Sequence, residues 1–285
     1  MSIIDEADLP EALLCDAAAQ RCPVVRGEAS MAALDEADLP EALVCDAAAQ
    51  RCPVVRYPRL LSATEVAEIH AFFVEEGAAC GTARKCADPV TGAAAWETTY
   101  LSTDLRFQRR FPALLAKLLD AARRADAAWF GGFARGVAVR PRVVEYHRVR
   151  RTGELRHAEH YDSGSVYTVD CMLSQPDEDF AGGDFAAEGP WAPEGGGRAF
   201  EDLGDVIVFA SHKRHNVKPV ARGERRVLVV EFWRGEERAC GHRCERATGA
   251  CAVRPVSAVI AASLADLAPE DQRSALAFLR GRTVF

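Results

Sequence analysis

The sequence lacks any hydrophobic run long enough to cross a membrane. Its longest apolar segments are short ones such as VIVFA (206–210) and VLVV (227–230), whereas a transmembrane helix needs about 20 consecutive apolar residues. The N-terminus also lacks the basic region of a signal peptide, because Asp5, Glu6 and Asp8 interrupt its apolar residues. We therefore expect no membrane partner and a cytoplasmic location.

An excess of basic residues is absent as well. The 285 residues include 35 lysines and arginines against 42 aspartates and glutamates, a formal net charge of −7. Nucleic-acid binding depends mainly on cations that neutralise phosphates, so we expect no nucleic-acid partner. Ten cysteines are too few for a disulfide-dense scaffold of this length. A small molecule, a peptide or a protein is the better expectation for a substrate.

A tandem repeat is present at the N-terminus. Residues 5–26 and 35–56 differ at a single position. Because two copies are too few for a solenoid, we expect residues 1–56 to form an appendage of unknown role, followed by one domain over residues 57–285.

Two further features of the repeat concern its start and its prolines. Each copy begins four residues after a methionine, Met1 or Met31. This is compatible with an alternative translation start at Met31 or with a natural protein that lacks residues 1–30. In the second copy, Pro40 suits the first turn of a short helix and Pro53 its end.

The rest of the chain predicts helices first and strands later. Ser62 and Glu65 have the spacing of a capping box before an apolar helical pattern that stops at Gly77. Residues 111–130 predict a second amphipathic helix, and a further helix is expected from Pro269 to Phe278. Between them lie four strand-like segments, at 137–149, 165–174, 204–211 and 225–233. This order predicts a mainly β fold with flanking helices, an antiparallel sandwich or barrel.

Two histidines and an aspartate have the pattern of an iron site. His160 and Asp162 are two residues apart, so in a strand their side chains would point to the same face. His215 follows a buried-looking strand and can supply a third ligand from a neighbouring strand. Two histidines and one carboxylate leave three positions open on the metal, as in non-haem Fe(II) oxygenases. Ten residues after His215, at the start of a strand, Arg225 has a guanidinium suited to a carboxylate.

With these residues in place, the segment from about 140 to 235, roughly a third of the chain, resembles the 2-oxoglutarate- and Fe(II)-dependent dioxygenases of the prolyl 4-hydroxylase type. A lone His-x-Asp triplet would be weak evidence, but the ordered set is specific. The elements that carry the resemblance are His160-x-Asp162, the strand closing at Leu173-Ser174, the turn Phe180-Ala181-Gly182-Gly183, Gly204-Asp205 before a hydrophobic strand, and His215-x-Val217-x-Pro219-Val220-x-x-Gly223-x-Arg225-x-x-Leu228.

The resemblance implies a double-stranded β-helix (jelly roll) with an N-terminal helical support. It implies that His160, Asp162 and His215 hold Fe(2+), and that Arg225 holds the C5 carboxylate of 2-oxoglutarate. O2 is then the other cosubstrate, ascorbate an accessory reductant, and succinate and CO2 the products beside a hydroxylated C–H bond. Tyr146 and Thr168 are expected near 2-oxoglutarate. A peptidyl residue, proline among the candidates, or a small molecule is the implied substrate.

A second register exists three residues earlier. His157 and Glu159, with His212 and Arg222, repeat the same spacing. Glu159 is one methylene longer than aspartate, and Arg222 falls in a turn where it would point to solvent. We therefore favour the set that ends at Arg225.

A cysteine-rich segment follows the last strand. Cys240, His242, Cys244 and Cys251 offer three thiols and an imidazole, but their spacing matches no common zinc finger. A zinc site, a disulfide and free thiols all remain open. A non-catalytic jelly-roll module that binds a partner through this segment or through the repeat is the alternative to the enzyme.

Overall fold

The computed structural model describes residues 47–157, 160–192 and 199–251. The chain divides into two compact units, Met31–Gly249 and a second one made of Met1–Ser30 and Ala250–Phe285. The description below concerns the first unit. The helix predicted from Pro269 to Phe278 lies outside the described residues.

An antiparallel sheet of eight strands forms the centre of this unit. In spatial order it contains β1 (Val55–Tyr57), β8 (Val206–Ala210), β5 (Tyr167–Met172), β10 (Val220–Trp233), β4 (Arg140–Arg150), β3 (Ala94–Tyr100) and β2 (Gly81–Ala87), and β6 (Phe180–Gly182) pairs with the start of β10. A second, small sheet consists of β7 (Phe185–Ala187) and β9 (His215–Val217). The four predicted strand segments correspond to β4, β5, β8 and β10, and the predicted jelly roll is confirmed.

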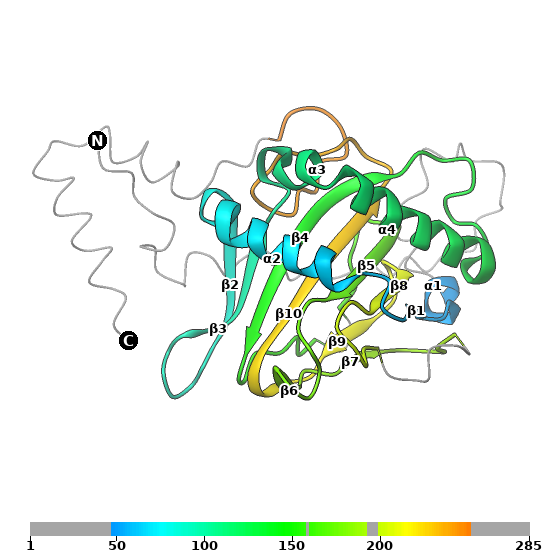
Figure 1. The fold of residues 1–285 in the computed structure, drawn as a ribbon. Helices are drawn as coiled ribbons and strands as arrows, with labels where there is room; N and C mark the ends of the chain where they lie inside the picture. The colour runs from blue at the N-terminus through cyan, green and yellow to red at the C-terminus, as the bar shows by residue number, and fades with distance from the viewer. Residues whose placement is uncertain (1–46, 158–159, 193–198, 252–285) are drawn as a thin grey trace, which may run out of the picture. The chain divides into compact units, whose positions relative to one another are not determined.

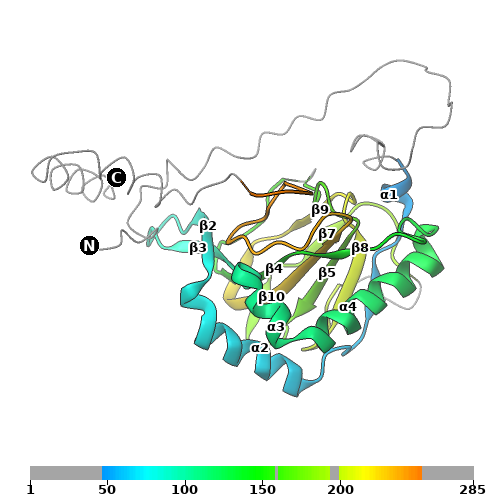
Figure 2. The ribbon, with the colours of Figure 1, turned by 90° about the horizontal axis from the view of Figure 1, so that it is seen from above.

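Helices α2 (Ala63–Glu76), α3 (Arg106–Arg110) and α4 (Pro112–Ala125) cover one face of the large sheet, and the small sheet lies beyond the other (Figures 1 and 2). Helix α1 (Ala47–Arg51) lies apart from this layer (Figure 2). The shorter turns are η5 (Gly77–Ala79), η6 (Thr103–Leu105) and η7 (Asp126–Phe130). The predicted capping box is confirmed: the Ser62 side chain accepts from the Glu65 backbone, and the Glu65 carboxylate accepts from the Ser62 backbone at 2.8 Å.

Strand alternation divides the core into two layers. On β10, Leu228 and Val230 face α2 and α4, together with Val169 of β5. Their neighbour Val227 belongs to a separate cluster with Phe209 on the opposite face of the sheet. Because successive side chains of a strand point to opposite faces, residue parity decides whether a side chain packs under the helices or toward the small sheet.

The end of the second repeat copy belongs to the domain, which corrects the boundary expected at residue 56. Strand β1 pairs with β8, and Cys52 and Val54 are buried. The buried Lys213 donates from Nζ to the carbonyls of Gln50 and Cys52 at 2.8 and 2.7 Å. Helix α1 ends at Arg51, ahead of Pro53 as predicted. Among the described residues, no helix has the length and apolar character to span a membrane.

Candidate metal and cosubstrate site

The two histidines and the aspartate singled out in the sequence come together at one end of the small sheet. Their ligand atoms all lie within 4.8 Å of one another. The nearest pairs are His160 Nε2 to Asp162 Oδ1 at 3.2 Å and His215 Nε2 to Asp162 Oδ2 at 3.9 Å. Asp162 and His215 are buried, whereas His160 is partly exposed. The site is therefore reached from solvent on its His160 side.

Backbone hydrogen bonds, not a regular strand, bring the three residues together. His160 and Asp162 lie in an irregular segment ahead of β5, so the strand geometry expected for them is wrong. The Asp162 amide donates to the Ser211 carbonyl at 2.7 Å, and the His215 amide donates to the His160 carbonyl at 2.9 Å. These two bonds fix the segment that carries His160 and Asp162 against the segment that carries His215.

His215 is held in the tautomer that binds a metal through Nε2. Its Nδ1 lies 2.9 Å from the Lys213 carbonyl, which can only accept, so Nδ1 carries the proton and the Nε2 lone pair is free for a metal. Burial lowers the pKa of His215. The rings of Phe185 and Phe209 pack against it at centroid distances of 5.4 and 4.8 Å.

Asp162 is oriented by a hydroxyl from β5. Thr168 donates from Oγ1 to Asp162 Oδ2 at 2.7 Å and lies 2.9 Å from the Ser211 hydroxyl. Burial acts to raise the pKa of Asp162, but the neighbouring His215 and His160 outweigh it and hold this pKa well below its ordinary value. The carboxylate is thus ionised and directed toward the imidazoles, and Thr168 acts through Asp162.

Arg225 is a buried cation with unused hydrogen-bond donors. Its side chain, 2% exposed, has no hydrogen-bond partner for Nε and Nη2 among the described residues. Burial lowers the pKa of Arg225 to about 10, so the group remains charged at neutral pH. Gly183 has a φ of +67°, and a Cβ there would lie 2.9 Å from Arg225 Cδ, so this position requires glycine. A buried guanidinium with free donors fits an incoming carboxylate.

Asp170 is a site residue that the sequence analysis missed. Its Oδ1 is buried and has no hydrogen-bond partner among the described residues. Burial, and next the charge of Asp162, raise the pKa of Asp170 to about 8, against the opposing effect of Arg225. Asp170 is therefore protonated at neutral pH and within electrostatic reach of both Asp162 and Arg225. The sequence did hold one signal for it: Asp170 follows Thr168 by two residues in a predicted strand, so the two side chains point to the same face.

Tyr146 does not lie where the resemblance placed it. It pairs in register with Leu228, which belongs to the core layer under the helices. The Tyr146 side chain therefore points to the helices and not to the opposite face of the sheet. Its ring stacks on Phe73 of α2 at 4.2 Å, and its hydroxyl lies 2.7 Å from His70 Nδ1. The expectation that Tyr146 contacts 2-oxoglutarate is corrected, because the sheet lies between this side chain and the triad.

The fold does not support the alternative set of site residues that begins three residues earlier, at His157. His157 and Arg222 are exposed, and Arg222 donates to the backbone carbonyls of Asp177 and Glu178. His212 is buried and stacks on Tyr161 at 5.5 Å; burial lowers its pKa to about 4. Glu159 lies outside the described residues. The arrangement supports the set of His160, Asp162, His215 and Arg225.

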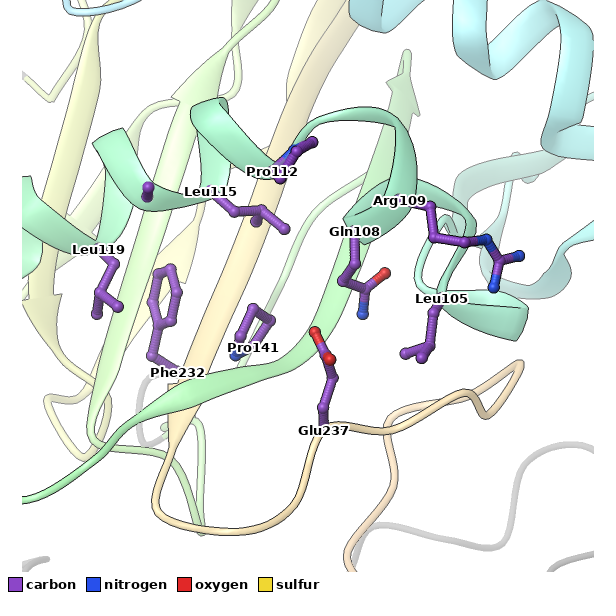
Figure 3. A pocket seen from close by; sticks show the side chains of 10 residues that line it. Leu105, Gln108, Arg109, Pro112, Leu115, Leu119, Pro141, Phe232 and Glu237 are labelled. Atoms are coloured by element: carbon purple, nitrogen blue, oxygen red, sulfur yellow. The ribbon is translucent and has the colours of Figure 1, made fainter.

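A hollow of about 410 Å³ lies elsewhere, between α3, α4 and the large sheet (Figure 3). Leu115, Phe232 and Glu237 are among the side chains that line it. Phe232 belongs to the layer that faces the helices, so this hollow is on the opposite side of the sheet from the triad.

Comparisons with known proteins give structural likenesses only. No family model matches the chain, and no curated protein matches it in sequence. An oxidoreductase of the 2OG-Fe(II) oxygenase family from Burkholderia pseudomallei is 20% identical, over 70% of this chain and 93% of that one, with a TM-score of 0.43. A prolyl-4-hydroxylase from Pseudomonas putida is 19% identical, over 69% and 99%, with a TM-score of 0.42.

HygX from Streptomyces hygroscopicus, solved with nickel, 2-oxoglutarate and hygromycin B bound, is 14% identical, over 65% of this chain and 86% of that one, with a TM-score of 0.44. The chain resembles the 2-oxoglutarate- and iron-dependent dioxygenases. At these identities and TM-scores, the assignment of its site depends on its own side chains.

Proposed function

We propose that the protein is an Fe(II)- and 2-oxoglutarate-dependent dioxygenase that hydroxylates a C–H bond and releases succinate and CO2. The substrate is a peptidyl residue, with proline among the candidates, or a small molecule. The observation that carries the proposal is the combination of a two-histidine, one-carboxylate group with the buried guanidinium of Arg225, whose Nε and Nη2 have no hydrogen-bond partner among the described residues. The first suits Fe(II) with open positions, and the second suits the distal carboxylate of 2-oxoglutarate.

The chain's own residues bind and orient in this proposal. His160, Asp162 and His215 would hold the iron, which with 2-oxoglutarate and O2 supplies the oxidising chemistry. Thr168 keeps the Asp162 carboxylate directed at the metal, and the Lys213 carbonyl keeps His215 in the required tautomer. The aromatic rings around His215 exclude water from one side of the centre.

Succinate release tests the proposal. Protein purified without oxygen and supplied with Fe(II), 2-oxoglutarate, ascorbate and air is expected to release succinate. Release should stop when iron, 2-oxoglutarate or O2 is omitted, and candidate substrates should increase it while gaining one oxygen atom by mass spectrometry. A protein that binds neither iron nor 2-oxoglutarate and releases no succinate would instead support the non-catalytic binding module.

Asp170 should make 2-oxoglutarate binding dependent on pH. Its pKa of about 8 leaves Asp170 neutral at pH 7. At higher pH Asp170 ionises, and its negative charge then repels the 2-oxoglutarate dianion. The surrounding charges are those of Arg225, Asp162, Glu145 and Glu231. The KM for 2-oxoglutarate is therefore expected to rise with pH, by up to about tenfold per pH unit once Asp170 ionises. The midpoint of the rise should lie at or below a pH of about 8, because bound iron offsets the Asp162 charge that helps to raise the pKa of Asp170.

The matched variant for this prediction is Asp170→Asn. It keeps the shape and a hydrogen-bond donor but cannot ionise, so its KM should stay flat across the same pH range. An equal rise in KM in the variant and in the wild type would show that another group causes the pH dependence.

A further inference from the structure

A second group of metal-ligating side chains lies in the loop that follows β10, drawn in orange in Figure 1. The ligand atoms of Cys240, His242 and Cys244 lie within 4.8 Å of one another. Cys244 is buried, and the other two are partly buried. The loop bends at Gly241 and His242. The bend brings three alternate residues together, whereas in a regular strand they would point to one face with about 7 Å between successive members.

The loop is held on both sides by hydrogen bonds to the rest of the domain. Its Cys244 carbonyl accepts from Arg142 Nε at 2.6 Å, and the Ala239 carbonyl accepts from the Asp104 amide at 2.9 Å. A Cβ added to Gly81 would lie 1.9 Å from the Gly241 carbonyl oxygen, so the two backbones are in close contact. The side chains at 240, 242 and 244 thus project from a backbone whose position is already determined, as a metal site requires.

We propose that Cys240, His242 and Cys244 bind a structural zinc ion. Two thiolates and an imidazole, completed by a fourth ligand, are a donor set typical of closed, tetrahedral zinc sites. Zinc bonds of about 2.0–2.3 Å separate the donor atoms by roughly 3.5–4 Å, which small side-chain rotations reach from the spacing in this loop.

The zinc loop, residues 240–244, also supports the segment that carries Asp162. Arg243 pairs with Glu231 at 2.6 Å and donates to the Ser163 carbonyl, directly after Asp162 in the chain. Arg142 donates to that same carbonyl. A zinc ion that fixes the loop therefore fixes Arg243, and through it the position of Ser163.

Metal analysis of the full-length chain tests the site without reference to catalysis. In a His160→Ala, Asp162→Ala, His215→Ala background, which removes the other cluster, we expect close to one equivalent of zinc per chain after dialysis. The added pair Cys240→Ser and Cys244→Ser should remove this zinc. Cys86→Ser, a change at an exposed thiol elsewhere, is the matched control and should retain it.

Cobalt substitution covers the case in which the double serine variant fails to fold. Cobalt(II) at the proposed site should give the visible bands of tetrahedral coordination and a near-ultraviolet thiolate-to-metal band. The thiolate band should weaken in Cys240→Ser and persist in Cys86→Ser. Lack of zinc in the parent, zinc retained by the double variant, an unchanged thiolate band in Cys240→Ser, or a disulfide among these cysteines with no metal bound would each overturn the proposal.

Discussion

Alanine at His160, Asp162 or His215 is expected to abolish succinate release and to weaken Fe(II) binding by at least about 100-fold. Each change removes a proposed direct ligand, and loss of groups that only support a ligand already costs about 10- to 100-fold in affinity or activity. The measurements are iron content after anaerobic reconstitution and succinate formed per chain. His215→Ala should have the cleanest effect, because this ring is buried and its Nδ1 is already committed to the Lys213 carbonyl.

His157→Ala is the control for register. His157 is exposed and lies three residues before His160, so the variant should keep both iron and activity. Loss of turnover in His157→Ala together with normal turnover in His160→Ala would shift the assignment to the earlier register and contradict the site described above.

Substitution of Arg225 is expected to have the largest effect on the cosubstrate. Arg225→Leu removes a buried cation and its free donors, and loss of one partner from a buried, hydrogen-bonded charge pair costs about 2–5 kcal/mol. The KM for 2-oxoglutarate should therefore rise by ~30-fold to more than ~1000-fold. Iron binding should change little, because Arg225 is not among the metal-ligating side chains.

The matched control is Arg222→Leu on the same strand. Arg222 is exposed and bonds only backbone carbonyls in the contacts given for it, so its KM should match the wild type. Direct titration of 2-oxoglutarate onto anaerobic, iron-loaded protein separates binding from turnover. Unchanged 2-oxoglutarate affinity in Arg225→Leu would mean that another group holds the carboxylate.

Much of the local structure was predictable because it depends on neighbours in the chain. The helix that begins at Ser62 has a capping box made by residues three apart, and the four apolar segments became β4, β5, β8 and β10. The candidate iron ligands were recognisable because their residue types and order are specific, even though His160 and Asp162 lie in an irregular segment instead of a strand.

Strand register decided which polar side chains share a face. Asp170 lies on the face of the sheet opposite the helices, and Tyr146 lies on the face toward them. Both faces follow from the register in which β5 and β4 pair with β10, because a shift of one residue moves a side chain to the other face. That phase is set by pairing between strands more than fifty residues apart, and no local pattern encodes it.

Residue types and short spacings in the sequence were thus sufficient for the class of fold, its helix starts, the candidate iron ligands and Arg225. The tertiary structure alone placed the end of the second repeat copy in the sheet and turned Tyr146 away from the triad. It also buried Arg225 Nε and Nη2 with no hydrogen-bond partner among the described residues, and it drew the thiols and imidazole of the proposed zinc loop together. The physical reason is that burial, and the unpaired polar groups it creates, arise only when distant segments pack against one another.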